Sequence, residues 1–415
     1  MKSTTAAILI AAVGSSSASA LPAVERRSFI DLEVNPVTNV QVGIRPYWLV
    51  DEMDKSATKE ALQQCVKDVT DFGVSQWSIG HRGGGTLQIP EHSWESNLAG
   101  ARMGAGILEC DVAFTKDLEL VCRHSHCDLH STTNIVAIPE LNAKCQVPFI
   151  SSDGMNPAQA KCCTQDITLK EFESLCALME GVNEHATTPE EYIRGTPDWR
   201  TDLYTCGTML SLKEHIELVE ELELKHIPEL KTPELPMPNG FTQEDFAAKM
   251  LKEYLDANVE PSDVFPQSFL YSDILYWKSK FPEFASNLVL LDDTDDMSEQ
   301  EAIERLKKYA ADKIPIVAPA LNALVTNVDS TIVPSQYAKT AKSLGMDIIA
   351  WTIERSGRLS EDNDDYYYHP IHEIVDSDGE VFEVLRVLLE DIKVKGVFSD
   401  WAATTTFFEN CMGVE

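Results

Sequence analysis

Histidine, arginine and carboxylate residues gather between residues 79 and 128 of this 415-residue chain. The run comprises His81, Arg82, Glu91, Glu109, Asp111 and His124. Two imidazoles can share proton transfer, because an unperturbed pKa near ~6.5 lets each act as acid or base. Carboxylates bind hard divalent cations, and a guanidinium group binds phosphate oxygens in pairs. These residue types together predict a metal-assisted site for phosphodiester chemistry.

Carboxylates two residues apart lie on one face of a strand, since successive side chains alternate between its faces. Glu109 and Asp111 therefore project together, and Cys110 projects away. A run further along the chain repeats the spacing with Glu229 and Lys231. Glu229 would add a third carboxylate for the cation, and Lys231 a positive charge for the phosphate. Taken alone, the first pair also fits two exposed acids on an edge strand, and the second fits a surface ion pair. The prediction therefore depends on several strand ends converging.

Short apolar runs alternate with amphipathic segments from residue 76 onward, which is typical of parallel strands joined by crossover helices. Strands are predicted at 77–80, 107–112, 119–122, 226–231, 264–268, 287–291, 347–351 and 396–398, and helices near 92–104, 211–224, 243–257, 298–310 and 378–391. The run 314–317 is a weaker ninth candidate strand. Eight strands predict an α/β fold of the TIM-type (β/α)8 barrel class, whose active sites form at the carboxyl ends of the strands. The candidate site residues fall at such ends.

The stretch from about 130 to 208 breaks the alternation and holds five prolines and several turn signals such as Asp153-Gly154. It predicts an insertion at the catalytic face of the barrel. We expect the barrel to span 76–415, and residues 21–75 to form an N-terminal extension packed on it.

Residues 1–20 combine Lys2, a short apolar stretch and small residues up to Ala20. This order predicts a signal peptide cleaved after Ala20, and the alternative is a tail rich in alanine and serine. Ten cysteines fit an oxidising compartment, so we expect a secreted or periplasmic protein with disulfide bonds. Cys162 and Cys163 are adjacent, and each is expected to pair with a distant partner. No later apolar run reaches the ~18 residues of a membrane-spanning helix, so no stable membrane insertion is expected.

The chain is strongly acidic, with 34 Lys and Arg against 67 Asp and Glu and a formal net charge of −33. This balance argues against nucleic acid as a partner. A small anionic substrate would instead need local positive charge, which Arg82, Lys231 and a bound cation would supply.

The candidate residues lie in motifs that closely resemble those of the glycerophosphodiester phosphodiesterases, in particular their secreted or periplasmic branch. The resemblance rests on HRGG, PEHS, ESN and GARMGAGILECDVAFTKDLELVCRHSHCDLHSTT, followed by IPELKTP, FPQSFLYSDILYWKSKFP, IIAWTI and GVFSDW. It runs in order over roughly residues 77 to 402, and an ordered set of motifs is far more specific than any one of them.

The resemblance implies a role for each matching residue. His81 and His124 match the catalytic histidines. The metal ligands would be Glu109, Asp111 and Glu229, for one divalent cation, Ca²⁺ or Mg²⁺; Arg82 and Lys231 would contact the phosphate, Glu91 would orient catalytic groups, and Trp351 would form an aromatic wall. Ser125 and Ala402 depart from the family pattern, which usually has aspartate and proline there. Hydrolysis of a glycerophosphodiester such as glycerophosphocholine to glycerol 3-phosphate and an alcohol is the implied reaction.

Two other functions remain open at this stage. One is a phospholipase D-like enzyme of the same superfamily acting on sphingomyelin or lysolipids, and the other is a non-catalytic barrel that binds lipid headgroups at a surface. Trp351 also fits a place in the core, and Asp400 fits a hydrogen-bonding position at the barrel mouth. His92, His126 and His130 are expected to support the site from behind or to lie at the surface. The oligomeric state is left open.

Overall fold

The computed structural model describes residues 34–200, 202–203, 206–361 and 366–413. The predicted signal peptide and its cleavage after Ala20 lie outside these residues. The unit Val34–Glu415 forms one set of internal contacts, and it contains every candidate site residue.

Eight parallel strands close into a barrel, which confirms the predicted TIM-type (β/α)8 fold. In order around the barrel they are β1 (Ser75–Gly80), β2 (Ala105–Phe114), β8 (Lys225–Leu230), β9 (Gln267–Ser268), β10 (Val289–Asp292), β11 (Ile316–Pro319), β14 (Asp347–Ile353) and β15 (Gly396–Ser399). Strand β1 pairs with β2 on one side and with β15 on the other, which completes the ring.

One predicted barrel strand is wrong. The run 119–122 forms β3 (Leu120–Cys122), which pairs antiparallel to β2, with Val112 opposite Cys122. The connection between β2 and β3 is a tight turn in which Thr115 N donates to Glu119 O at 2.9 Å. Parallel strands need a crossover of about a dozen residues, so this turn allows only a hairpin. The weaker candidate at 314–317 supplies the missing barrel strand, β11.

The barrel interior is filled by an apolar layer. It consists of Ile79, Ile107, Ile227, Phe265, Val289, Leu291, Ile316, Ala318, Ile349 and Phe398, with Trp351 packed against it. Because side chains alternate along each strand, the residue two positions beyond each of these points into the barrel one layer closer to the carboxyl ends. This layer therefore forms the floor on which the site is built.

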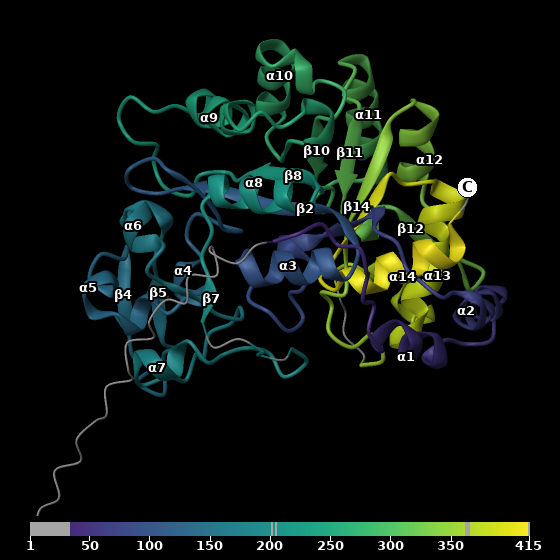
Figure 1. Ribbon diagram of the computed structural model, residues 1–415, viewed down its shortest axis with the longest axis horizontal. Coiled ribbons are helices and arrows are strands. Elements are labelled where there is room, and N and C mark those ends of the chain that lie inside the picture. The colour runs from purple at the N-terminus through teal and green to yellow at the C-terminus, as the bar shows by residue number, and fades with distance from the viewer. Residues whose placement is uncertain (1–33, 201, 204–205, 362–365, 414–415) are drawn as a thin grey trace, which may run out of the picture. The chain divides into compact units, whose positions relative to one another are not determined.

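Helices follow the strands and lie outside them (Figure 1). They are α3 (Trp94–Arg102), α8 (Leu212–Glu221), α9 (Gln243–Asp256), α10 (Tyr271–Lys280), α11 (Glu299–Ala311), α12 (Gln336–Ser343), α13 (Val381–Arg386), which continues as η10 (Val387–Ile392), and α14 (Ala402–Met412). Ser211, Thr242 and Ser298 start α8, α9 and α11 with capping boxes. Their hydroxyl groups satisfy backbone N–H groups that have no partner within the helix, which defines where each helix begins.

The stretch between β3 and α8 folds into short elements around its own apolar cluster. They are α4 (Leu129–Thr132), α5 (Pro139–Asn142), α6 (Leu169–Phe172), α7 (Pro189–Tyr192), the hairpin of β4 (Val147–Ile150) with β5 (Gln159–Lys161), and the pair β6 (Cys176–Ala177) and β7 (Gly207–Thr208). Three disulfides staple it, Cys127–Cys163, Cys145–Cys162 and Cys176–Cys206. The adjacent cysteines therefore pair with distant partners, as predicted.

Two helices precede the barrel, α1 (Arg45–Glu52) and α2 (Ala57–Asp68), and both lie beside α13 and α14 (Figure 1). The disulfide Cys65–Cys411 joins α2 to α14. A fifth disulfide, Cys110–Cys122, crosses the β2–β3 hairpin on the side that faces away from the barrel interior. Among the described residues, no helix has both the length and the apolar character needed to cross a membrane.

Candidate active site

Three carboxylates converge at the carboxyl ends of β2 and β8. Glu109 and Asp111 stand two and four residues beyond Ile107, and Glu229 stands two beyond Ile227. Asp111 lies opposite Glu229 in the register between the two strands. Each of the three carboxylates offers an oxygen within 4.8 Å of those of the other two, and all three residues are buried.

Burial and mutual repulsion raise the pKa values of two of these carboxylates, whereas Lys231 and His92, against the effect of burial, lower that of Asp111 well below its usual value. Burial first, and then the charges of Asp111 and Glu229, raise the pKa of Glu109 well above its usual value. Burial also raises the pKa of Glu229 to about 8, although Lys231 Nζ lies 2.6 Å from Glu229 Oε1. Asp111 Oδ1 is buried and accepts no hydrogen bond from the residues that the structure describes. A divalent cation would relieve this excess of negative charge, so the donor set fits a hard metal ion.

His81 begins a short 3-10 turn, η2 (His81–Gly83), directly after β1. Its Nδ1 is hydrogen-bonded to Oδ1 of Asp400, which follows β15, and its Nε2 lies 3.9 Å from Glu109 Oε2. Burial lowers the pKa of His81 to about 4, against the opposing effect of Asp400. His81 is therefore neutral at pH 7. When Nδ1–H donates to Asp400, the lone pair on Nε2 is directed toward the carboxylates.

Arg82 is held in place from both its backbone and its side chain. Its backbone N–H donates to Glu109 Oε2 at 2.8 Å, and its Nη1 donates to Glu91 Oε2 at 2.7 Å. The Nε donor of Arg82 is buried and has no partner among the described residues. Burial would raise the pKa of Glu91, but Arg82 and Arg355 hold it well below its usual value. A fixed guanidinium with an unused donor is suited to a phosphate oxygen.

His124 reaches the site through the hairpin rather than from a barrel strand. Arg123 N donates to Asp111 O at 2.7 Å, so the chain turns back beside β2 at this point. Burial, Arg82 and Lys231 lower the pKa of His124 well below its usual value. The predicted placement of His124 at a barrel strand end is wrong in detail, but the residue still lies among the charged groups of the site.

Asp400 anchors a group of charged residues at the barrel mouth, which agrees with the hydrogen-bonding position expected for it. Besides His81, its carboxylate accepts from Arg355 Nη1 at 2.9 Å and from Arg200 Nη2 at 3.2 Å. Glu180 accepts from the same two arginines, at 2.6 Å and 3.2 Å, and lies 3.9 Å from Arg82 Nη1. Glu180, Arg200 and Arg355 were not predicted from the sequence. Only Arg355 had a local signal, two residues beyond Ile353 of β14.

Other polar residues support the carboxylates from behind. His92 is fully buried, and its Nε2 lies 2.8 Å from Asp111 Oδ2. Gln267 Nε2 donates to Glu109 Oε1 at 2.9 Å. His126 packs edge-on against Phe114, with ring centroids 4.9 Å apart. His92 therefore lies behind the carboxylates, and His126 lies in the core. Gln267 was not predicted as a site residue.

Trp351 lies two residues beyond Ile349 on β14 and packs against the apolar layer of the barrel. Its Nε1 donates to Ala318 O at 2.8 Å, and its side chain is half-buried. The two departures from the family pattern also have local partners. Ser125 Oγ donates to Glu234, and Ala402 N donates to Gly84 O at 3.0 Å. Proline at position 402 would lack the N–H for that bond.

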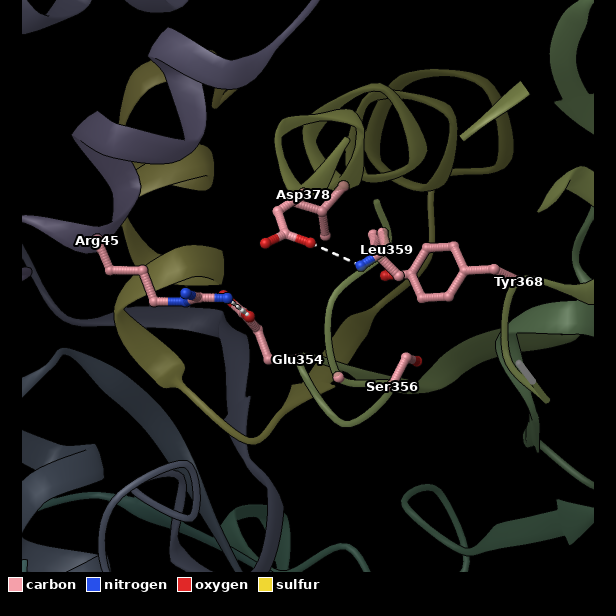
Figure 2. A pocket seen from close by; sticks show the side chains of 8 residues that line it. Arg45, Glu354, Ser356, Leu359, Tyr368 and Asp378 are labelled. Carbon is pink, nitrogen blue, oxygen red and sulfur yellow. Dashed lines mark hydrogen bonds and ion pairs between the residues drawn. The ribbon is translucent and has the colours of Figure 1, made fainter. Parts of the chain in front are cut away.

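A small pocket lies beside α1, and its lining includes none of the three carboxylates at the ends of β2 and β8 (Figure 2). Arg45 pairs there with Glu354, and Leu359 N donates to Asp378 Oδ1 at 2.6 Å. Glu354 also accepts from the Thr404 hydroxyl group. Since Glu354 directly precedes Arg355, these bonds fix the start of the segment that carries Arg355 to the site.

Comparison with known proteins agrees with this geometry. The model of the glycerophosphoryl diester phosphodiesterase family matches residues 81–404. A curated relative from Arthroderma benhamiae, named an extracellular protein, is 39% identical over 245 residues, which are 57% of this chain and 100% of the relative.

Solved structures share the fold. A candidate glycerophosphoryl diester phosphodiesterase from Silicibacter pomeroyi superposes with a TM-score of 0.54 at 17% identity, covering 83% of this chain and 95% of that one. Another from Agrobacterium tumefaciens gives a TM-score of 0.50 at 15% identity, covering 82% and 100%. The family match spans the barrel from His81 past Asp400, and this chain therefore belongs to the glycerophosphoryl diester phosphodiesterase family.

Proposed function

We propose that the protein is a metal-dependent hydrolase that cleaves glycerophosphodiesters to glycerol 3-phosphate and an alcohol. The observation that carries the proposal is the convergence of Glu109, Asp111 and Glu229 beside His81 and Arg82 at the barrel mouth of a family member. Carboxylates for a cation, an imidazole for proton transfer and a guanidinium group for the phosphate are the group types that phosphodiester hydrolysis uses, which supports the proposal.

Glu109, Asp111 and Glu229 would together hold one divalent cation, Ca²⁺ or Mg²⁺. When bound, the cation would supply positive charge to a non-bridging phosphate oxygen. Arg82 would bind another phosphate oxygen through its unused Nε, and Glu91 fixes the direction of that guanidinium. Lys231, which lies beside Glu229, adds a further positive charge.

The two histidines would share the proton transfer. His81 is held by Asp400 and is neutral, so its Nε2 can accept a proton from the attacking water or attack phosphorus itself. Burial, Arg82 and Lys231 hold the pKa of His124 well below its usual value, and the negative charge of a bound phosphate would raise it again. His124, protonated beside that phosphate, would then donate a proton to the oxygen of the departing alcohol as the phosphorus–oxygen bond breaks. Trp351 would form one wall of the substrate site, since it is half-buried above the apolar layer.

We also propose secretion and the predicted division of the chain. Five disulfides and the similarity to a protein named extracellular support an oxidising environment outside the cell. The proposed boundaries are a signal peptide at 1–20, an extension at 21–75 and the barrel at 76–415, with the insertion at about 130–208.

Product analysis on purified protein tests the activity. Glycerophosphocholine, glycerophosphoethanolamine and lysophosphatidylcholine are incubated separately, and all phosphorus-containing products are identified by ³¹P spectroscopy. The proposal expects glycerol 3-phosphate from the first two substrates, and loss of that product by at least about 100-fold in His124→Ala. Preferential cleavage of the lysolipid would favour the phospholipase D-like function. A protein that binds these compounds without turnover would favour the headgroup-binding barrel.

A further inference from the structure

Four aromatic side chains cluster around Trp351 and are called the aromatic wall below: Phe269, Trp351, Tyr366 and Tyr367. The ring centroid of Trp351 lies 6.0 Å from that of Phe269, 6.2 Å from that of Tyr366 and 6.1 Å from that of Tyr367. Tyr366 and Tyr367 contact each other edge-on at 4.9 Å. The wall thus joins residues from the ends of β9 and β14 with a segment more than ten residues further along the chain.

The aromatic wall adjoins the metal-binding carboxylates. Phe269 lies two residues beyond Gln267, whose Nε2 donates to Glu109 at 2.9 Å. Trp351 bridges to Ala320, which directly follows β11. The wall therefore covers the arc of the barrel mouth from β9 to β14, whereas His81 and Arg82 follow β1. One arm of a phosphodiester bound to Arg82 would reach this arc.

Two residues of the wall, Phe269 and Tyr366, are open to solvent, and the other two, Trp351 and Tyr367, are partly buried. Phe269 is 40% exposed and Tyr366 is 38% exposed. Burial first, and then the nearby carboxylates of Asp295 and Asp293, raise the pKa of the Tyr366 hydroxyl group. Asp293 and Asp295 are themselves exposed and lie just beyond β10. Exposed aromatic faces next to carboxylates form a site for a weakly hydrated cation.

We propose that the aromatic wall with Asp295 binds the quaternary ammonium group of a substrate headgroup, such as the trimethylammonium of a choline ester. The inference rests on the proposed hydrolase function and adds a headgroup preference to it. A quaternary ammonium has no N–H donor, so it gains more from aromatic faces and nearby charge than from hydrogen bonds. The net charge of −33 further favours a cationic arm over an anionic one.

Two isosteric substrates separate charge recognition from simple apolar contact. The choline ester of glycerol 3-phosphate is compared with its 3,3-dimethylbutyl ester, in which carbon replaces the quaternary nitrogen. The two arms have the same shape and differ by one positive charge. We expect KM to be about tenfold lower for the choline ester, which corresponds to the strength of a partly desolvated cation–π contact. Equal KM values would overturn the inference while leaving the hydrolase function intact.

Single substitutions test which residues produce the difference between the two KM values. Tyr366→Leu and Asp295→Asn should each bring the ratio of the two KM values toward one, whereas Tyr366→Phe keeps the ring and should keep most of the ratio. Tyr276→Leu is the matched control, because Tyr276 lies on α10 against Phe281, outside the wall. A ratio that drops equally in Tyr276→Leu would point to general loss of structure and contradict the assignment.

A binding experiment tests the site without turnover. Tetramethylammonium chloride is titrated against the full chain while tryptophan fluorescence is recorded, with sodium chloride at equal ionic strength as reference. We expect saturable binding in the millimolar range that weakens about tenfold in Tyr366→Leu. A titration indistinguishable from sodium chloride would overturn the inference, whatever the protein hydrolyses. Absence of turnover on both esters with intact tetramethylammonium binding would instead contradict the hydrolase function.

Discussion

His81 Nδ1 is hydrogen-bonded to Asp400 Oδ1, although the two residues stand 319 positions apart in the chain. Strands β1 and β15 are neighbours in the closed barrel, so their carboxyl ends bring the two side chains together. Asp400 also holds Arg200 and Arg355. It therefore determines which ring nitrogen of His81 faces the carboxylate cluster.

Replacing Asp400 with asparagine tests this positioning role. Asp400→Asn keeps the size but removes the charge, and an amide can bind His81 Nδ1 in the wrong tautomer. We expect kcat to fall by about 100-fold or more with a smaller change in KM. The measurement is steady-state hydrolysis of glycerophosphocholine across pH. A variant with unchanged kcat and an unchanged pH profile would mean that Asp400 only supports the fold.

Glu180 places a carboxylate among Arg82, Arg200 and Arg355 at the barrel mouth. Its side chain is 38% exposed, so its charge is partly screened by water. Glu180→Gln should leave net positive charge there and strengthen inhibition by dianionic glycerol 3-phosphate about threefold to tenfold at low salt. The inhibition constant is measured at two ionic strengths. Weaker inhibition in the variant would show that Glu180 chiefly orients the arginines.

Buried His126 should make the folded state sensitive to acid. Burial lowers its pKa to about 4, whereas the unfolded chain has a value near ~6.5. Between these values the unfolded state binds more protons, so the free energy of unfolding must fall as pH falls from about 6.5 toward 4. At pH 5 this one residue accounts for about 2 kcal/mol.

Urea unfolding at pH 7 and pH 5 measures this contribution. His126→Asn should lose some stability at both pH values, because it replaces a ring packed against Phe114. The drop between pH 7 and pH 5 should nevertheless shrink by about 2 kcal/mol relative to the unmodified protein. An equal drop in both proteins would assign the acid sensitivity to other groups. His185→Asn serves as the control, since His185 is exposed.

The carboxylate positions were predictable because they follow from period two within single strands. Glu109, Asp111 and Glu229 sit at fixed offsets from Ile107 and Ile227, and the pleat directs all of them into the barrel. Arg82 lies in the turn η2 directly after β1, so its place at the same mouth of the barrel was predictable from the end of that strand. Most of the candidate site was therefore predictable from the spacing of residues within or directly after single strands.

The remaining parts depend on tertiary contacts that no local pattern encodes. The strand β3 looked like a barrel strand in hydrophobicity, and only the five-residue connection from β2 reveals the hairpin. Arg200 and Glu180 come from the stretch between β3 and α8, which contains its own apolar cluster and three disulfides. Their place beside Asp400 is set by that folding rather than by spacing.

Metal-dependent turnover tests the central claim most directly. Bound metal is removed with chelator, Ca²⁺ or Mg²⁺ is added back, and hydrolysis of glycerophosphocholine is followed. The proteins compared are the unmodified protein, Asp111→Asn, Glu229→Gln and the control Glu253→Gln on α9. We predict that turnover disappears with chelator and returns with one of the two ions in the unmodified protein and the control. The two carboxylate variants should stay at least about 100-fold below them at every metal concentration tested. Full turnover in the presence of chelator, or in Asp111→Asn, would contradict the account.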